Sequence, residues 1–377
     1  MAFTDSKLAR IGLNACLVAA SVAATLFVIE IGLRLATNFQ EDSRYDYWRQ
    51  ATYTSFFYHY IAQRPAEQPP KNFDAVRGWT DFSIRRGPHE FIIEDVLGVP
   101  WRETQYIPDA KTRRRVILLG DSFTYGWKVA REDTIDRILS VRLGEQFEVI
   151  NLATRGYGVD QMLLVANEII PQLSPDDVVV GFIAHDLVRS CQSTAYRTIE
   201  ESKYVLAAKP TFKLVDGRLV WPRAVPTPYE FYLQRHEGLI DTILARLYSV
   251  RTLALAMEPL LQRAQETCTA KLNAALLRFL MDDAPKKTRI HLIHLDGVLP
   301  AEFTTEMAAL NIPYYSAPAD IDTTSQALGV AADRHPDSHP KAGLNAIYAY
   351  MIYKMLGETP PVVSPHSAAG DATKQQR

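Results

Sequence analysis

Cysteine and net charge are both scarce in this sequence, and each scarcity excludes a class of function. The 377 residues include three cysteines, Cys16, Cys191 and Cys268, whose spacing fits neither a zinc site nor a redox motif. The formal net charge of −2 gives no reason to expect nucleic acid as a partner. No glycine-rich phosphate loop of the Walker or dinucleotide type is present, so no cofactor is expected.

The apolar content, in contrast, is ample. Hydrophobic residues make up 47% and aromatic residues 10% of the chain, enough for one large domain or two ordinary ones. Cys16 lies in an apolar N-terminal run. Cys191 and Cys268 are expected either to form one disulfide in an oxidising compartment or to remain two buried free thiols.

The first apolar run favours a membrane anchor. Residues 11–29 are apolar apart from three small polar residues, which is close to the roughly 20 residues that a membrane-spanning helix needs. A cleaved signal peptide is the alternative, although its apolar core is usually shorter, about 7–15 residues. Lys7 and Arg10 favour a cytoplasmic N-terminus, while Arg34 and other basic residues beyond the run weaken that bias. We expect residues 1–37 to anchor the chain in a membrane as a single pass, with the main domain on the side away from the cytoplasm.

The remaining chain divides into three regions. Residues 38–110 form a juxtamembrane lead-in, rich in aromatic residues, in which 91–93 and 96–99 are expected to be short strands or loop anchors that lead into the core. Residues 111–357 form the main domain, and 190–287 are an insertion in it that holds a hairpin over 212–221 and a mostly helical stretch over 230–281. Residues 358–377 have the composition of a disordered tail.

The main domain alternates between short apolar runs and segments with helical spacing. The expected strands are 116–119, 147–151, 178–183, 290–295 and a short edge strand at 312–315, and the expected helices include 135–143, 161–173 and 342–356. Continuous apolar strands separated by helices predict an α/β domain with a parallel sheet that helices cover on both faces.

The segment after the first core strand has two interpretations. Val116 to Leu119 are followed by Gly120-Asp121-Ser122 and a segment with helical character. The carboxyl end of a buried parallel strand is where open α/β sheets bind their ligands, so Ser122 is a candidate nucleophile. Asp121 and Ser122 are also common helix N-caps, and on this stretch alone the two interpretations are balanced.

A polar loop late in the chain decides for Ser122 as a nucleophile. A serine nucleophile needs a base, and the base needs an acid that orients it. Two Asp-x-His pairs, Asp333 with His335 and Asp337 with His339, lie between the last strand and the last helix. We prefer His339 and Asp337 because that pair directly precedes the helix, whose start fixes its position.

Other polar positions are weaker candidates. Gly156 and Gly158 lie in the loop after the second core strand, where a glycine lets backbone N–H groups approach a ligand. His291 and His294 are three residues apart in a strand and therefore point to opposite faces, so we expect them to be structural and expect no metal site.

Three blocks of this chain resemble those of the SGNH, or GDSL-type, esterase and lipase superfamily, in its membrane-anchored or exported bacterial branch. Gly120 to Gly126 resemble the first block, which implies Ser122 as nucleophile and as an oxyanion donor through its own amide. Residues 151–161 resemble the second block, which implies Gly156 as a donor, and Asp337 to Pro340 resemble the last block. The resemblance covers 113–187 and 288–356 and implies a three-layer α/β/α fold with a flavodoxin-like five-stranded sheet.

The third block departs from the family pattern. It usually reads Gly-x-Asn-Asp, whereas this chain has Ala184-His185-Asp186. Three outcomes stay open: His185 donates to the oxyanion in place of the asparagine, the donor is missing, or the site binds without turnover.

These patterns together predict a membrane-anchored serine esterase. The resemblance to the bacterial branch implies an anchor in the inner membrane with the domain on the periplasmic side and, as substrate, an O-acyl ester, such as an O-acetyl group, on a cell-envelope glycan. Transfer of the acyl group to a polysaccharide is the first alternative, because hydrolysis and transfer share an acyl-enzyme. A non-catalytic binding or assembly factor in polysaccharide export is the second. The expected partners are an acylated glycan and the membrane.

Overall fold

The computed structural model describes positions scattered between 14 and 31, residues 71–221 and 224–227 with short gaps at 98, 100–103 and 201–202, position 230, and residues 258–357. The chain divides into two compact units, Met1–Pro65 with Tyr229–Gln262, and Ala66–Pro228 with Arg263–Arg377. The candidate site lies wholly in the second unit.

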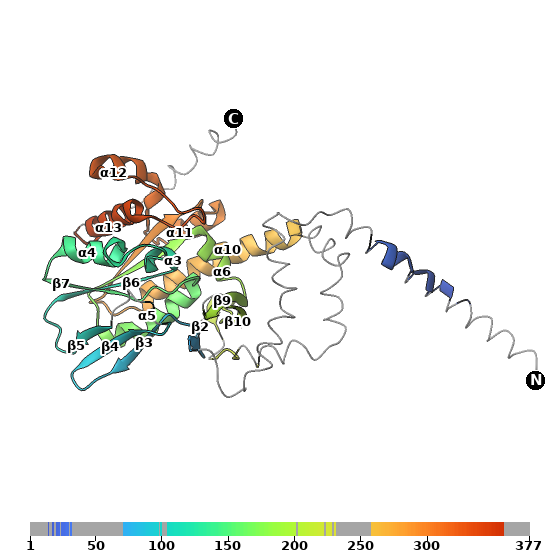
Figure 1. Cartoon of the computed structure of the whole chain (residues 1–377), viewed down its shortest axis with the longest axis horizontal. Coiled ribbons are helices and arrows are strands. Elements are labelled where there is room, and N and C mark those ends of the chain that lie inside the picture. The colour runs from blue at the N-terminus through green and yellow to red at the C-terminus, as the bar shows by residue number, and fades with distance from the viewer. Residues whose placement is uncertain are drawn as a thin grey trace, which may run out of the picture. The chain divides into compact units, whose positions relative to one another are not determined.

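A five-stranded parallel sheet forms the centre of the second unit (Figure 1). Its strands are β6 (Arg114–Gly120), β7 (Phe147–Asn151), β8 (Asp177–Ile183), β13 (Arg289–Asp296) and β14 (Tyr315–Ser316). The order β14-β13-β8-β6-β7 is flavodoxin-like, as the resemblance implied. The expected short strand at 312–315 is reduced to two residues, but it does lie at the sheet edge.

Helices cover both faces of this sheet, which gives three layers. Because strand side chains alternate, Ile117 and Leu119 of β6 face one core cluster, and Val116 and Leu118 face the other. The first cluster includes side chains of α5 (Val159–Leu173), α10 (Glu258–Asp283) and α11 (Ala301–Ala309). The second includes those of α4 (Ile135–Leu143) and α13 (Ala342–Gly357). Shorter helical segments are η1 (Arg131–Asp133), η2 (Ala317–Ala319) and α12 (Ile321–Leu328).

The segment before β6 is built into the domain as antiparallel structure. Strands β1 (Phe73–Asp74) and β2 (Gly78–Trp79) pair, and β3 (Phe82–Arg86), β4 (Glu90–Asp95) and β5 (Gln105–Pro108) form a three-stranded sheet. The strand expected at 91–93 is confirmed within β4. At its described positions the segment 96–99 is a loop, the other of the two alternatives, because the Asp95 carboxylate accepts hydrogen bonds from the N–H groups of Leu97 and Val99 and so turns the chain.

The insertion contains two hairpins. The one expected over 212–221 is confirmed as β11 (Lys213–Val215) and β12 (Arg218–Val220), with Asp216 and Gly217 both at positive φ in the turn. The other, β9 (Thr194–Glu200) with β10 (Lys203–Ala208), has no such turn signal in the sequence. A disulfide joins Cys191 to Cys268, which resolves the two arrangements left open by the sequence.

The predicted anchor falls largely outside the described residues. The described positions between Asn14 and Ile31 are helical and exposed. Among the parts of the chain that the structure describes, no helix combines the length and the apolar character needed to cross a membrane. The aromatic stretch at 45–60, the proline-containing linker and the tail at 358–377 also lie outside the described residues.

Candidate active site

The turn after β6 gives Asp121 and Ser122 separate roles. Asp121 is the N-cap of α3 (Ser122–Tyr125), and its carboxylate accepts a hydrogen bond from the Phe123 N–H at 2.9 Å. Ser122 is the first residue of α3, so its own N–H has no carbonyl partner within the helix. The helix-cap interpretation therefore holds for Asp121, whereas the Ser122 hydroxyl does not cap the helix.

Gly120 is required for space rather than for an unusual backbone conformation. A Cβ atom there would lie 2.2 Å from Oγ1 of Thr124 and 2.7 Å from the carbonyl oxygen of Gly181. Gly120 pairs with Gly181 across β6 and β8, so the nucleophile turn sits tightly against the end of the next strand.

The structure brings Ser122 and His339 together. Nε2 of His339 lies 2.9 Å from Oγ of Ser122, and the Ser122 hydroxyl is 3.4 Å from the Asp121 carboxylate behind it. The loop that carries His339 is a tight hairpin, in which the His335 N–H donates to the His339 carbonyl at 2.8 Å. His339, and not His335, is thus the histidine whose ring reaches the serine.

Asp337 lies against the far nitrogen of that ring. Oδ1 of Asp337 is 3.2 Å from Nδ1 of His339, outside hydrogen-bond geometry but within ion-pair distance once the ring is protonated. Its Oδ2 contacts the Lys128 ammonium. The hydrogen bond from Lys128, more than the neighbouring His339, lowers the pKa of Asp337 to about 2, so this carboxyl is ionised throughout the neutral range.

The second-block loop is fastened beside the nucleophile turn. The Thr154 N–H donates to the Gly120 carbonyl at 3.0 Å, and the Tyr157 N–H closes a turn back to Thr154 at 3.2 Å. Gly156 occupies the third position of that turn with φ +71°, a left-handed conformation that favours glycine. The loop glycine expected from the sequence is therefore placed at the sheet edge that carries Ser122.

The sequence did not reveal that residues of the lead-in segment hold this loop in place. Arg155 donates to the Asp81 carboxylate through its backbone N–H at 3.0 Å and through its side-chain Nε at 2.8 Å. The indole of Trp79 donates to the Arg155 carbonyl at 3.2 Å, and the Tyr157 hydroxyl donates to the Trp79 carbonyl at 2.6 Å. No spacing in the sequence links these segments, which are more than 70 positions apart.

A half-buried arginine joins the first, second and third blocks. Arg189, the last residue of α6 (Ala184–Arg189), donates to Asp121 at 3.1 Å, to Asp186, and to the Tyr157 carbonyl at 3.4 Å. Both carboxylates are fully buried. Burial first, and the negative charge of Asp121 second, raise the pKa of Asp186 well above its ordinary value, against the opposing effect of Arg189.

His185 is the exposed second residue of α6, directly after β8. Nδ1 of His185 lies 3.4 Å from the Arg189 guanidinium, which can only donate. Nδ1 is therefore the accepting nitrogen, and the ring proton of the neutral form is on Nε2. His185 thus carries an N–H donor at the sheet edge where the family has its asparagine.

The two strand histidines have structural partners, as the sequence indicated. Nε2 of His291 lies 2.8 Å from the Asp177 carboxylate, and His294 lies between the Ser316 hydroxyl at 3.1 Å and the Asp296 carbonyl at 2.8 Å. Among the residues that the structure describes, no group of three or more His, Cys, Asp or Glu side chains is placed to hold a metal ion.

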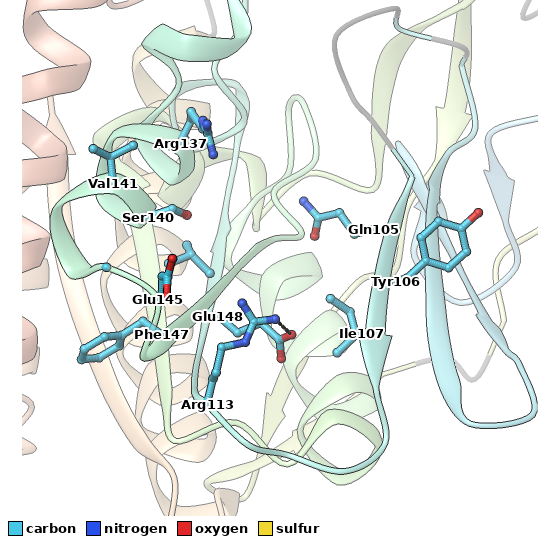
Figure 2. Close-up of a pocket in the computed structure, with 12 residues that line it drawn as sticks. Gln105, Tyr106, Ile107, Arg113, Arg137, Ser140, Val141, Glu145, Phe147 and Glu148 are labelled. Atoms are coloured by element: carbon cyan, nitrogen blue, oxygen red, sulfur yellow. Dashed lines mark hydrogen bonds and ion pairs between the residues drawn. The ribbon is translucent and has the colours of Figure 1, made fainter.

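A cavity of about 470 Å³ lies away from these residues, between β5, β7 and α4. Figure 2 shows Tyr106 and Ile107 on one side of it and Ser140 and Phe147 on the other. An ion pair between Arg113 and Glu148, at 2.9 Å, crosses its floor. The cavity contains none of the predicted site residues and no histidine or cysteine, so it offers no nucleophile–base pair.

Comparison with known proteins finds matches among solved structures but not among family models or curated proteins. The three solved structures described here are esterases. A psychrotrophic esterase, EstA, from Pseudoalteromonas sp. is 13% identical with a TM-score of 0.34, over 65% of this chain and 100% of that one. A two-domain esterase active on acetylated mannans is 12% identical with a TM-score of 0.34, over 67% of this chain and 52% of that one. Est24, a carbohydrate acetylesterase from Sinorhizobium meliloti, is 11% identical with a TM-score of 0.31, over 65% of this chain and 99% of that one. At these scores the likeness carries no weight for the site, whose interpretation depends on the chain's own geometry.

Proposed function

We propose that this chain is a serine esterase of the SGNH, GDSL-type kind that hydrolyses an O-acyl ester through an acyl-enzyme on Ser122. The observation that carries the proposal is the 2.9 Å contact between Oγ of Ser122 and Nε2 of His339. A serine hydroxyl within hydrogen-bond distance of an imidazole, itself next to a carboxylate, is the arrangement that activates a serine nucleophile.

The reaction proceeds in two half-steps. Oγ of Ser122 attacks the ester carbonyl carbon while Nε2 of His339 accepts the hydroxyl proton. The tetrahedral intermediate collapses, the alcohol leaves with that proton, and the acyl group remains on Oγ. Water then attacks the acyl-enzyme, again losing a proton to His339, and the carboxylic acid leaves as Ser122 regains its hydrogen. Asp337 stabilises the imidazolium in both half-steps, because its carboxylate lies 3.2 Å from Nδ1.

Three N–H groups are assigned to the oxyanion. The Ser122 N–H is available at the start of α3, and the turn at Gly156 supplies a second backbone donor. His185 supplies the third through Nε2, since its Nδ1 accepts from Arg189. This assignment favours donation by His185 over the two other outcomes that the third block left open.

The substrate and location follow from the rest of the chain. A basic N-terminus, an apolar run over 11–29 and a large following domain support an inner-membrane anchor with the site on the periplasmic side. The Cys191–Cys268 disulfide supports an oxidising compartment. An esterase held there meets envelope glycans, so we assign the substrate to O-acyl groups, such as O-acetyl, on such a glycan.

A fluorophosphonate probe tests the proposal. We expect the folded wild-type protein and Ser140→Ala, a matched serine variant on α4, to be labelled and Ser122→Ala to remain unlabelled. If a folded wild-type protein is not labelled, the result would favour a binding role in glycan export. An acyl ester offered with and without polysaccharide then separates free acid, the product of hydrolysis, from acylated glycan, the product of transfer.

A further inference from the structure

One carboxylate in the site is shared by two basic side chains from distant segments. Lys128 follows the nucleophile turn, and its ammonium contacts Oδ2 of Asp337, 209 positions along the chain. The other oxygen of Asp337 faces Nδ1 of His339 at 3.2 Å. The lysine therefore fixes the carboxylate on the side opposite the histidine.

One residue of this contact, and the residue next to the other, have a backbone conformation that residues with a Cβ atom rarely adopt. Lys128 has φ +67°, and Ser338, between Asp337 and His339, has φ +69°. Left-handed conformations are disfavoured for residues with a Cβ atom and are found preferentially at functional sites. Lys128 is held in this conformation directly after Trp127, whose N–H donates to the Ser122 carbonyl at 3.1 Å.

We propose that Lys128 is a positioning residue that holds the Asp337 carboxylate beside His339 and so sets the pH range over which His339 accepts the Ser122 proton. The inference rests on the proposed function. Lys128 and Asp337 are 46% and 40% exposed, so without the lysine the carboxylate is free to turn toward water. Because exposed ion pairs are weak, the expected effect is several-fold and not a complete loss.

Two other charged groups near the pair have partners of their own. Arg334, on the same loop as Asp337, donates to Asp296 at 2.8 Å and to the Ser338 carbonyl at 3.2 Å. Behind Ser122, Asp121 is paired with Arg189. Lys128 is therefore the cation whose removal changes the charge beside Asp337 while leaving these pairs intact.

Labelling rates with the fluorophosphonate, measured against pH on the full-length protein, test the role. We expect Lys128→Met and Lys128→Gly to label about two- to fivefold more slowly near neutral pH, and Lys128→Arg to retain most of the rate. The acidic limb of both slow profiles moves to lower pH, because a carboxylate that has turned toward water no longer stabilises the protonated imidazole. Lys111→Met, which breaks a comparable pair with Asp176 far from the site, is the matched control.

Lys128→Gly separates positioning from folding, since glycine adopts positive φ without strain and the variant should unfold no more easily than the wild type. Rates and pH profiles equal to wild type in both slow variants would overturn the positioning role.

An unlabelled wild-type protein would overturn the proposed function instead. The positioning role is then judged by NMR titration of the Asp337 carboxyl, whose pKa of about 2 should rise toward 3.8 in Lys128→Met. An unchanged titration overturns it.

Discussion

Nε2 of His339 lies 2.9 Å from Oγ of Ser122, although 217 positions separate the two residues. The parallel sheet makes this possible, because the turn after β6 and the loop before α13 both lie at the carboxyl edge of the strands. The serine is only 8% exposed, so the contact forms in a partly desolvated site where it is stronger than in water.

Replacing each of the two loop histidines by alanine in turn tests which of them is the base. We expect His339→Ala to lower kcat by about 10²–10⁴, whereas His335→Ala keeps most of the activity, since the His335 contribution to the hairpin is a backbone N–H. Ester hydrolysis is measured on both variants after their unfolding midpoints are matched to the wild type. The opposite ranking would assign the role to Asp333 and His335.

Two substitutions at His185 test its part in the oxyanion site. His185→Ala should lower kcat by about 10²–10³, the usual effect of losing one oxyanion donor. His185→Asn should keep or raise kcat, because an amide N–H replaces the ring N–H. His185 is exposed, so neither change should disturb the fold. An unaffected alanine variant would show that the donor is missing, and a large loss in the asparagine variant would show that His185 has a role of its own.

The regular part of the fold was predictable because it depends on local patterns. The apolar runs placed β6, β7, β8 and β13, and the bounds of α4 and β7 agree with those expected. Ser122 was predictable because its motif directly follows a buried strand, and His339 because its motif directly precedes the last helix. Of the two alternatives for 96–99, the structure has the loop, since Asp95 side-chain hydrogen bonds compete with a strand.

The supporting residues were not predictable, because their partners lie far away and their types are ordinary. Arg189 reads as a surface residue at a helix end, yet it is the cation between two buried carboxylates. Asp81 and Lys128 carry no motif, and only the folded chain brings them to Arg155 and Asp337. Such pairs need tertiary contacts that composition and spacing do not encode.

Removal of Arg189 should destabilise the protein severely. Arg189→Met leaves Asp121 and Asp186 buried without their cation, which costs about 3–5 kcal/mol for a buried pair. Arg278→Met, which breaks an exposed pair with Asp282, is the control and should cost at most about 1 kcal/mol. Chemical denaturation measures both. Adding Asp186→Asn to Arg189→Met should recover part of the loss, and equal stabilities of the two single variants would contradict the assignment.

Acid should destabilise the fold in part through His294. Burial lowers the pKa of His294 to about 4 from its ordinary 6.5, against the opposing effect of Asp296. Between these values the unfolded chain binds more protons, so stability is full above about pH 6.5 and is lost as the pH falls toward 4, by about 3 kcal/mol. Denaturation at pH 7.5 and 4.5 should therefore show a smaller loss in His294→Gln than in the wild type, with the exposed His89→Gln as control. An identical loss would refute this account.

The disulfide should contribute stability without taking part in the chemistry. Cys191 and Cys268 close a loop with a sequence separation of 77, and constraining a loop of that length in the unfolded state stabilises a protein by roughly 2–4 kcal/mol. The double variant Cys191→Ser, Cys268→Ser should therefore unfold at a lower denaturant concentration, and reduction of the wild type should reproduce the change. Cys16→Ser is the control, since Cys16 is not part of the bond.

Below its unfolding transition the double variant should still label at Ser122, because neither cysteine contacts Ser122 or His339 in the described structure. Loss of labelling from a folded double variant would instead show that the bond holds α6, and with it Arg189, in the active arrangement.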